Sequence, residues 1–103
     1  VGSDNALILI AKNAEGYVGV LTAYVIPQIR KGEKILEIEE FFVLPEYQGK
    51  GIAAKLMDSA ISWAKEKGLA CVRLETSLEL KRAHSFYERY GFKVNSKGYE
   101  YKF

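Results

Sequence analysis

Two glycines separated by one residue stand directly before a segment with helical periodicity. Gly49 and Gly51 have no side chains, so a ligand can approach the backbone closely at these positions. The first N–H groups of a helix have no intrahelical partner and lie at the positive end of its dipole. The arrangement predicts an anion site, to which Lys50 adds a positive charge suited to a phosphate. A tight strand-to-helix turn with no ligand is the alternative that the spacing leaves open.

The glycine loop lacks the two common nucleotide-binding motifs. The sequence contains no G-x-x-x-x-G-K-[ST] segment, and the third glycine of a dinucleotide-binding loop does not follow Gly49 and Gly51. These absences disfavour an ATPase and a dehydrogenase.

Three glutamates occupy one predicted strand and are the second candidate for chemistry. Glu37 and Glu39 alternate with apolar Leu36 and Ile38, but Glu40 follows Glu39 directly and breaks the period of two. A bulge near Glu40 would explain the break, and bulges often re-aim side chains at functional sites. Two solvated carboxylates at a strand end are the alternative.

The elements that must position these residues follow from the apolar pattern. Apolar runs bounded by turn residues predict three antiparallel strands, at 6–11, 17–26 and 35–44. Apolar residues at helical spacing predict a helix from about Gly49 to Lys67, ended by Gly68. Next follow a strand at 70–75, a helix opened by a capping box at 76–79 and ended by Gly91, and a last hairpin within 92–103.

The predicted order is therefore β-β-β-α-β-α-β-β, a mixed α/β (α+β) fold with a mixed sheet. The strand, helix and strand in its middle form one crossover unit, so the third and fourth strands should run parallel. The chain contains no repeat and no linker, which predicts one domain over residues 1–103.

Composition narrows the classes of function. The chain has 15 basic and 13 acidic residues, a net charge of +2, and no basic stripe, so nucleic acid is not an expected partner. One cysteine and one histidine argue against a disulfide framework and against a metal site. The lack of a disulfide framework predicts a reducing cytoplasm. No apolar run is long enough to cross a membrane, so no membrane partner is expected.

Two motifs, separated by a helix and a strand, resemble those of the GNAT superfamily of acetyl-CoA-dependent N-acetyltransferases. The segment Gln48-Gly-Lys-Gly51-Ile-Ala53 fits the family pattern [Q/R]-x-x-G-x-[G/A] at each specified position. The segment Ala83-His-Ser-Phe86-Tyr87-Glu-Arg-Tyr-Gly91-Phe92 fits A-x-x-F-Y-x-x-x-G-F. The resemblance covers about residues 6–103. It implies the acyl-CoA N-acyltransferase fold, with acetyl-CoA as co-substrate and no metal.

The resemblance implies two parts of a coenzyme A site. Backbone groups near Phe42, Val43 and Leu44 are expected to pair with the pantetheine arm, where the family separates its two central parallel strands. The residues expected at the pyrophosphate are Gln48, Gly49, Lys50, Gly51, Ile52 and Ala53.

The resemblance also implies catalytic roles. Tyr87 matches the family tyrosine that points its hydroxyl at the thioester sulfur, and a phenol with an ordinary pKa of about 10 can return a proton to a thiolate. Glu39 aligns with an acidic residue that binds the acceptor amine or deprotonates it through water, and Glu40 is the second candidate. The alternative for Tyr87 is a core aromatic, beside Phe86 and Tyr90.

Two departures from the family pattern keep a second function open. Leu80 occupies the place of a family asparagine that contacts the cofactor, and the chain opens at what resembles the family's second strand. We therefore expect either a minimal domain or one that has lost its usual first strand and two helices.

The sequence predicts an N-acetyltransferase acting on a small amine, such as a polyamine or an aminoglycoside, or on a peptide or protein amine. A catalytically silent acyl-CoA-binding or scaffold module of the same fold is the alternative. The exposed edge of the first predicted strand is compatible with a homodimer.

Overall fold

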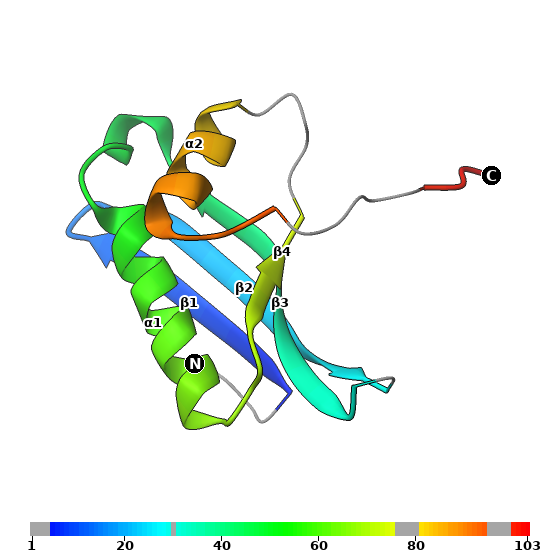
Figure 1. The fold of residues 1–103 in the computed structure, drawn as a ribbon. Coiled ribbons are helices and arrows are strands. Elements are labelled where there is room, and N and C mark those ends of the chain that lie inside the picture. Colours follow the sequence, from blue (N-terminus) through cyan, green and yellow to red (C-terminus); the bar gives the residue numbers. More distant parts are fainter. Residues whose placement is uncertain (1–4, 30, 76–80, 95–99) are drawn as a thin grey trace.

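A four-stranded sheet in the order β1-β2-β3-β4 is the frame of the molecule (Figure 1). The computed structural model describes residues 5–29, 31–75, 81–94 and 100–103. The strands are β1 (Ala6–Asn13), β2 (Gly16–Gln28), β3 (Glu33–Val43) and β4 (Val72–Leu74). The first three are antiparallel and β4 is parallel to β3, which confirms the predicted topology of these four strands.

Two helices and a short turn complete the described elements. A 3-10 turn, η1 (Pro45–Tyr47), follows β3 and leads to helix α1 (Ile52–Glu66). Helix α2 (Lys81–Tyr90) follows β4. Both helices lie on the same face of the sheet, with α1 running across β1, β2 and β3 (Figure 1). Neither described helix is both long and apolar enough to cross a membrane.

The core lies between α1 and one face of the sheet. Alternate strand residues point toward the helix, and α1 presents its apolar stripe to them. The buried members from the sheet are Leu7, Leu21, Ala23, Leu36, Ile38 and Val43, and those from α1 are Leu56, Met57, Ala60 and Ala64.

The opposite face of the sheet, called the outer face below, carries no described helix. Its exposed apolar side chains include Ile8 and Ile10 of β1, Tyr24 of β2 and Phe42 of β3.

Helix α1 begins and ends at glycines, as its sequence predicted. Gly51 is the residue before its first turn and has a left-handed backbone, with φ 84°. At the other end, Gly68 N–H donates to the Lys65 carbonyl and Leu69 N–H donates to the Ala64 carbonyl. This pair of bonds is the Schellman arrangement, which satisfies carbonyls that a helix end would otherwise leave without a partner.

Strand β2 extends beyond its predicted end at residue 26, through Pro27 to Gln28. A proline lacks the N–H that an inner strand must donate, so it fits only where one edge of the strand is free. Among the described residues, the last hydrogen bond on this side of β2 joins Val25 N–H to the Asn5 carbonyl, so the only described partner of Pro27 is Lys34 of β3. The proline therefore stands where no described strand requires its N–H.

The described residues of the predicted last hairpin form no strand. Residues 92–94 and 100–103 have no regular secondary structure, and 95–99 lie outside the described residues. Phe92 packs on α2 instead, because its N–H donates to the Tyr87 carbonyl and its ring contacts those of Tyr87 and Tyr90. Residues 100–103 point away from the sheet (Figure 1), and a two-stranded hairpin without a sheet to join is only marginally stable.

Truncation of the central core should cost more stability than truncation of the surface. Leu21 is 0% exposed in the inner strand β2, so Leu21→Ala should lower the free energy of unfolding. The expected loss is about 2–5 kcal/mol, from lost burial and the cavity that remains. Ile29 is 91% exposed and Ile29→Ala is the control. Its effect should stay within about 0.5 kcal/mol, and equal midpoints in urea unfolding for the two variants would contradict this description of the core.

Candidate active site

β3 pairs with β4 over three residues and then continues without a described partner on that side. The parallel pairing joins Leu36–Ile38 of β3 to Val72–Leu74 of β4 and goes no further, although β3 continues to Val43. The paired stretch is fastened by an ion pair, in which Arg73 Nη2 lies 2.6 Å from Glu37 Oε1. From Glu39 to Val43, no described strand pairs with this edge of β3, which we call the open edge.

The predicted bulge in β3 is confirmed. Thr22 of β2 pairs with Glu40, whereas the next residue, Ala23, pairs with Ile38, so Glu39 is the extra residue. In a bulge, two residues of one strand oppose one residue of the other. Ile38 and Phe41 therefore both reach the core side, and Glu39 and Glu40 between them are both exposed.

The carboxylate of Glu40 is anchored to β2. Its Oε1 accepts a hydrogen bond from Thr22 Oγ1 at 3.3 Å, and its backbone N–H donates to the same hydroxyl at 3.1 Å. Neither Glu39 nor Glu40 forms an ion pair with any residue that the structure describes. Both carboxylates are thus without a cationic partner among the described residues.

The alternation of the backbone decides which groups face the open edge. Leu44 N–H donates to the Val18 carbonyl of β2 at 2.9 Å, so this group points away from the open edge. Successive residues of a strand direct their N–H and C=O groups to opposite sides, so Phe41 and Val43 face the open edge and Phe42 faces β2. Of the residues predicted to pair with the pantetheine arm, Val43 has backbone groups on the open edge, whereas those of Phe42 and Leu44 point toward β2. Phe41, which the sequence analysis did not name, also faces the open edge.

The side chain of Gln48 ties the glycine loop to the end of β3. Its Nε2 donates to the Val43 carbonyl at 2.9 Å, which occupies that oxygen on the open edge. The Val43 N–H is left on the same edge. Gln48 therefore holds the loop in position relative to the end of β3.

The glycine loop leaves open space in front of α1. Gly49 and Gly51 have φ values of 79° and 84°, which L side chains rarely adopt, and a Cβ at either position would meet no atom within 4 Å. No side chain caps the first turn of α1, and that turn contains no acidic residue. Ile52 and Ala53 pack against the core, so their backbone N–H groups are what they can offer to an anion. Lys50 Nζ lies 5.6 Å from the centre of the Tyr47 ring, at the mouth of the loop.

Tyr87 lies in an aromatic cluster beside the open edge. Its ring centre is 6.2 Å from that of Phe41, and Phe86 and Phe92 complete its surroundings. The ring is half-buried, and desolvation by burial raises the pKa of the Tyr87 hydroxyl above its ordinary value. Among the described residues, none forms a hydrogen bond with this hydroxyl. Tyr87 thus packs against the core and has a hydroxyl that no described residue engages, so its catalytic role stays a prediction.

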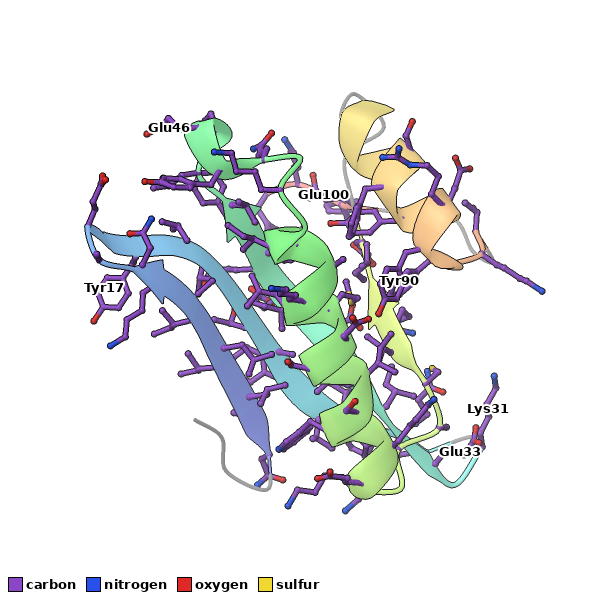
Figure 2. All side chains as sticks on the ribbon, turned by 90° about the vertical axis from the view of Figure 1, so that its left-hand side faces the viewer. Tyr17, Lys31, Glu33, Glu46, Tyr90 and Glu100 are labelled. Atoms are coloured by element: carbon purple, nitrogen blue, oxygen red, sulfur yellow. The ribbon has the colours of Figure 1, made fainter. Side chains whose placement is uncertain are left out.

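Tyr90, one turn further along α2, has its hydroxyl engaged. Figure 2 shows its side chain between the two helices, where the hydroxyl donates to Asp58 Oδ1 of α1. Burial, together with the hydrogen bond to the Asp58 carboxylate and the charge of that group, raises the pKa of Tyr90 to about 12. The bond fastens α2, which carries Tyr87, to α1.

The predicted site residues therefore fall into two groups around the open edge. Tyr87 stands on the helix side of the sheet, next to Phe41, and the glycine loop continues from the same end of β3. Glu40 stands on the outer face, next to Thr22. Phe41 links the groups, because its ring contacts Tyr87 while its backbone follows the bulge. Leu80 lies outside the described residues.

Comparison with known proteins decides the family. The model of the acetyltransferase (GNAT) family matches residues 2–92. The chain belongs to the GNAT family. This confirms the prediction made from the two motifs.

Relatives of this GNAT chain are longer proteins. An uncharacterized N-acetyltransferase of Methanocaldococcus jannaschii is 43% identical over 67 residues, which are 65% of this chain and 29% of that protein. The matches to this relative and to others from Archaeoglobus fulgidus and Mycobacterium bovis span 29%, 37% and 43% of those proteins.

Solved structures share the fold over nearly the whole GNAT chain. A transcriptional regulator of Bacillus halodurans superposes with a TM-score of 0.88 at 31% identity, over 98% of this chain and 68% of that one. AAC(6')-Iy, in complex with the bisubstrate analogue CoA-S-monomethyl-acetylneamine, superposes with a TM-score of 0.87 at 22% identity, over 97% of this chain and 70% of that one. The second likeness shows the fold alone.

The tie between the helices predicts a pH-dependent stability. Because folding raises the pKa of Tyr90 from 10.0 to about 12, the stabilisation is fully present below pH 10 and is lost as the pH rises toward 12. Tyr90→Phe should be less stable than the wild type at pH 8 and should lose less stability between pH 10 and 12. Chemical unfolding at each pH measures both effects.

Tyr17→Phe is the control, because this ring is exposed at the β1–β2 turn and should leave the pH dependence unchanged. The same pH dependence in Tyr90→Phe and in the wild type would contradict the assignment to Tyr90.

Proposed function

We propose that this GNAT domain is an acetyl-CoA-dependent N-acetyltransferase that transfers the acetyl group directly to an amine. The observation that carries the proposal is the edge of β3 beyond Ile38, which no described strand pairs with and which lies next to Tyr87 and leads to the glycine loop. Among the described residues, a strand edge with unpaired N–H groups, the first turn of α1 and a phenol without a hydrogen bond lie along one path. Such a path suits a long ligand that has an amide-containing arm and a diphosphate.

The residues present fit coenzyme A at both ends of this path. The uncapped first turn of α1 and the open space over Gly49 and Gly51 suit a pyrophosphate. The open-edge groups of Phe41 and Val43 can pair with the amides of a pantetheine arm, as a neighbouring strand would. Lys50 needs only to leave the Tyr47 ring to add its charge. When bound, acetyl-CoA supplies an acetyl thioester.

Each remaining step has a group in this chain to perform it. The amine must lose a proton to become a nucleophile, and Glu39 and Glu40 are carboxylates that can accept it, directly or through water. The thiolate that leaves when the carbon–sulfur bond breaks must gain a proton, which the Tyr87 hydroxyl holds. The raised pKa of Tyr87 keeps that hydroxyl protonated at neutral pH. A backbone N–H of the open edge is a donor suited to the developing oxyanion.

The acceptor is proposed to be a primary amine, from a small molecule such as a polyamine or an aminoglycoside, or from a peptide. Amines are cationic before they lose a proton, and two exposed carboxylates without ion-pair partners attract them. The bisubstrate analogue bound by AAC(6')-Iy is compatible with a small amine, but the 22% identity transfers only the fold.

Two measurements on the same preparation test the proposal. Calorimetric titration with acetyl-CoA measures binding, and thiol release in the presence of polyamines, aminoglycosides, amino acids or a lysine peptide measures transfer. Binding with turnover is the expected result. Binding without turnover on any amine would favour a silent acyl-CoA-binding module, and no binding would contradict the whole proposal.

Removal of the Tyr87 hydroxyl should affect the chemical step. Tyr87→Phe should lower kcat by roughly 10²–10⁴-fold, the range for a positioned proton donor. The dissociation constant for acetyl-CoA should stay near the wild-type value, because the aromatic packing is kept. Tyr17→Phe is the matched control, and unchanged turnover in Tyr87→Phe would exclude this tyrosine as the acid.

A side chain in the glycine loop should affect binding. A β-branched residue at φ 84° is strained, and its Cβ would stand in the open space over the loop, so Gly51→Val should weaken acetyl-CoA binding. Gly32→Val is the matched control, because Gly32 has φ 66° and equally open surroundings but lies in the β2–β3 turn. Equal losses of affinity in the two variants, measured by calorimetry, would place the phosphates elsewhere.

A further inference from the structure

We propose that Thr22 is a positioning residue, which holds Glu40 in place for the acceptor amine. The inference rests on the proposed function and names a residue on β2 that neither family motif contains. Its basis is the pair of hydrogen bonds that joins one hydroxyl to both the backbone and the carboxylate of Glu40.

The bulge creates the need for such a residue. With Glu39 inserted, β3 has two residues opposite Thr22, and the regular ladder is disturbed at this point. Thr22 Oγ1 accepts the Glu40 N–H at 3.1 Å, so a side-chain oxygen satisfies a backbone donor at the bulge. Valine or isoleucine would fit a strand equally well but could not accept this bond.

The same hydroxyl restricts the carboxylate. Thr22 Oγ1 donates its proton to Glu40 Oε1 at 3.3 Å, since a hydroxyl can donate once while it accepts another bond. Thr22 Oγ1 thus holds both the backbone and the carboxylate of Glu40. One carboxylate oxygen is then engaged, and the other is left for an amine or a water molecule.

The surroundings of Glu40 distinguish it from the other glutamates of β3. Glu37, on the same outer face, is committed to Arg73, with its Oε1 2.6 Å from Nη2 and 2.9 Å from Nε. Glu39 has neither an ion pair nor a hydrogen bond among the described residues. Among the contacts of the described residues, Glu40 is the one of the three that is both held by a hydrogen bond and without a cationic partner. The structure therefore favours Glu40, the second candidate of the sequence, as the oriented carboxylate at the acceptor site.

The test compares Thr22→Val with Thr22→Ser. Valine has nearly the same shape and no hydroxyl, so Thr22→Val should raise KM for the amine by about 10-fold, the effect of losing a hydrogen bond to a charged group. The dissociation constant for acetyl-CoA should not change. Thr22→Ser keeps the hydroxyl and should restore KM toward the wild-type value. Thermal unfolding establishes that both variants are folded.

Two further measurements separate positioning from a structural role. In a Glu40→Gln background, Thr22→Val should have little additional effect on KM, because the two changes remove the same interaction. Amide hydrogen exchange at Glu40 should be faster in Thr22→Val than in the wild type or in Thr22→Ser, and this readout does not require turnover.

Each outcome decides between the two proposals. An active wild type with unaltered KM in Thr22→Val, or with equal losses in Thr22→Val and Thr22→Ser, would overturn the role of Thr22 and leave the acetyltransferase intact. A wild type that binds acetyl-CoA but acetylates no amine would overturn the proposed function and this inference with it.

Discussion

One extra residue in β3 determines most of the arrangement around the site. Ile38 and Phe41 must both face the core, although their spacing would place them on opposite faces of a regular strand. The bulge at Glu39 resolves the conflict, and it also turns two carboxylates outward. Pairing between β3 and β4 ends at Ile38, one residue before Glu39, so the bulge lies at the start of the open edge. The bulge therefore leaves the two glutamates exposed and places the ring of Phe41 on the helix side of the sheet.

Four further contacts hold the elements around the open edge together. Glu37 and Arg73 join β3 to β4 just before their pairing ends, and Tyr90 and Asp58 join α2 to α1 on the helix side. Helix α1 is in turn held against three strands by its buried stripe. The Gln48 side chain then ties the glycine loop to the strand that it follows. Pre-organisation of this kind lets a ligand bind without first ordering the chain.

The sequence predicted the elements that local patterns specify. Alternation located the strands, its failure at Glu40 located the bulge, and the glycines located both ends of α1. The tie between Tyr90 and Asp58 could not be predicted in this way, because it depends on how two helices pack that are separated in sequence. The direction in which the backbone groups of Phe41 and Leu44 point could not be assigned before the pairing of β3 with β2 was known. A shift of the pairing by one residue reverses the direction of every backbone group. The continuation of β2 beyond Pro27 could not be predicted either, because it depends on where the pairing with β1 ends.

The continuation of β2 through Pro27 also affects self-association. Beyond Asn5, no described residue pairs with this edge of β2, and an unpaired strand edge is a template for pairing with other chains. Pro27 stands on this edge and has no N–H to donate, so an incoming strand would find a gap in the ladder and a ring in its way. Pro27 therefore disfavours edge-to-edge aggregation along this part of β2.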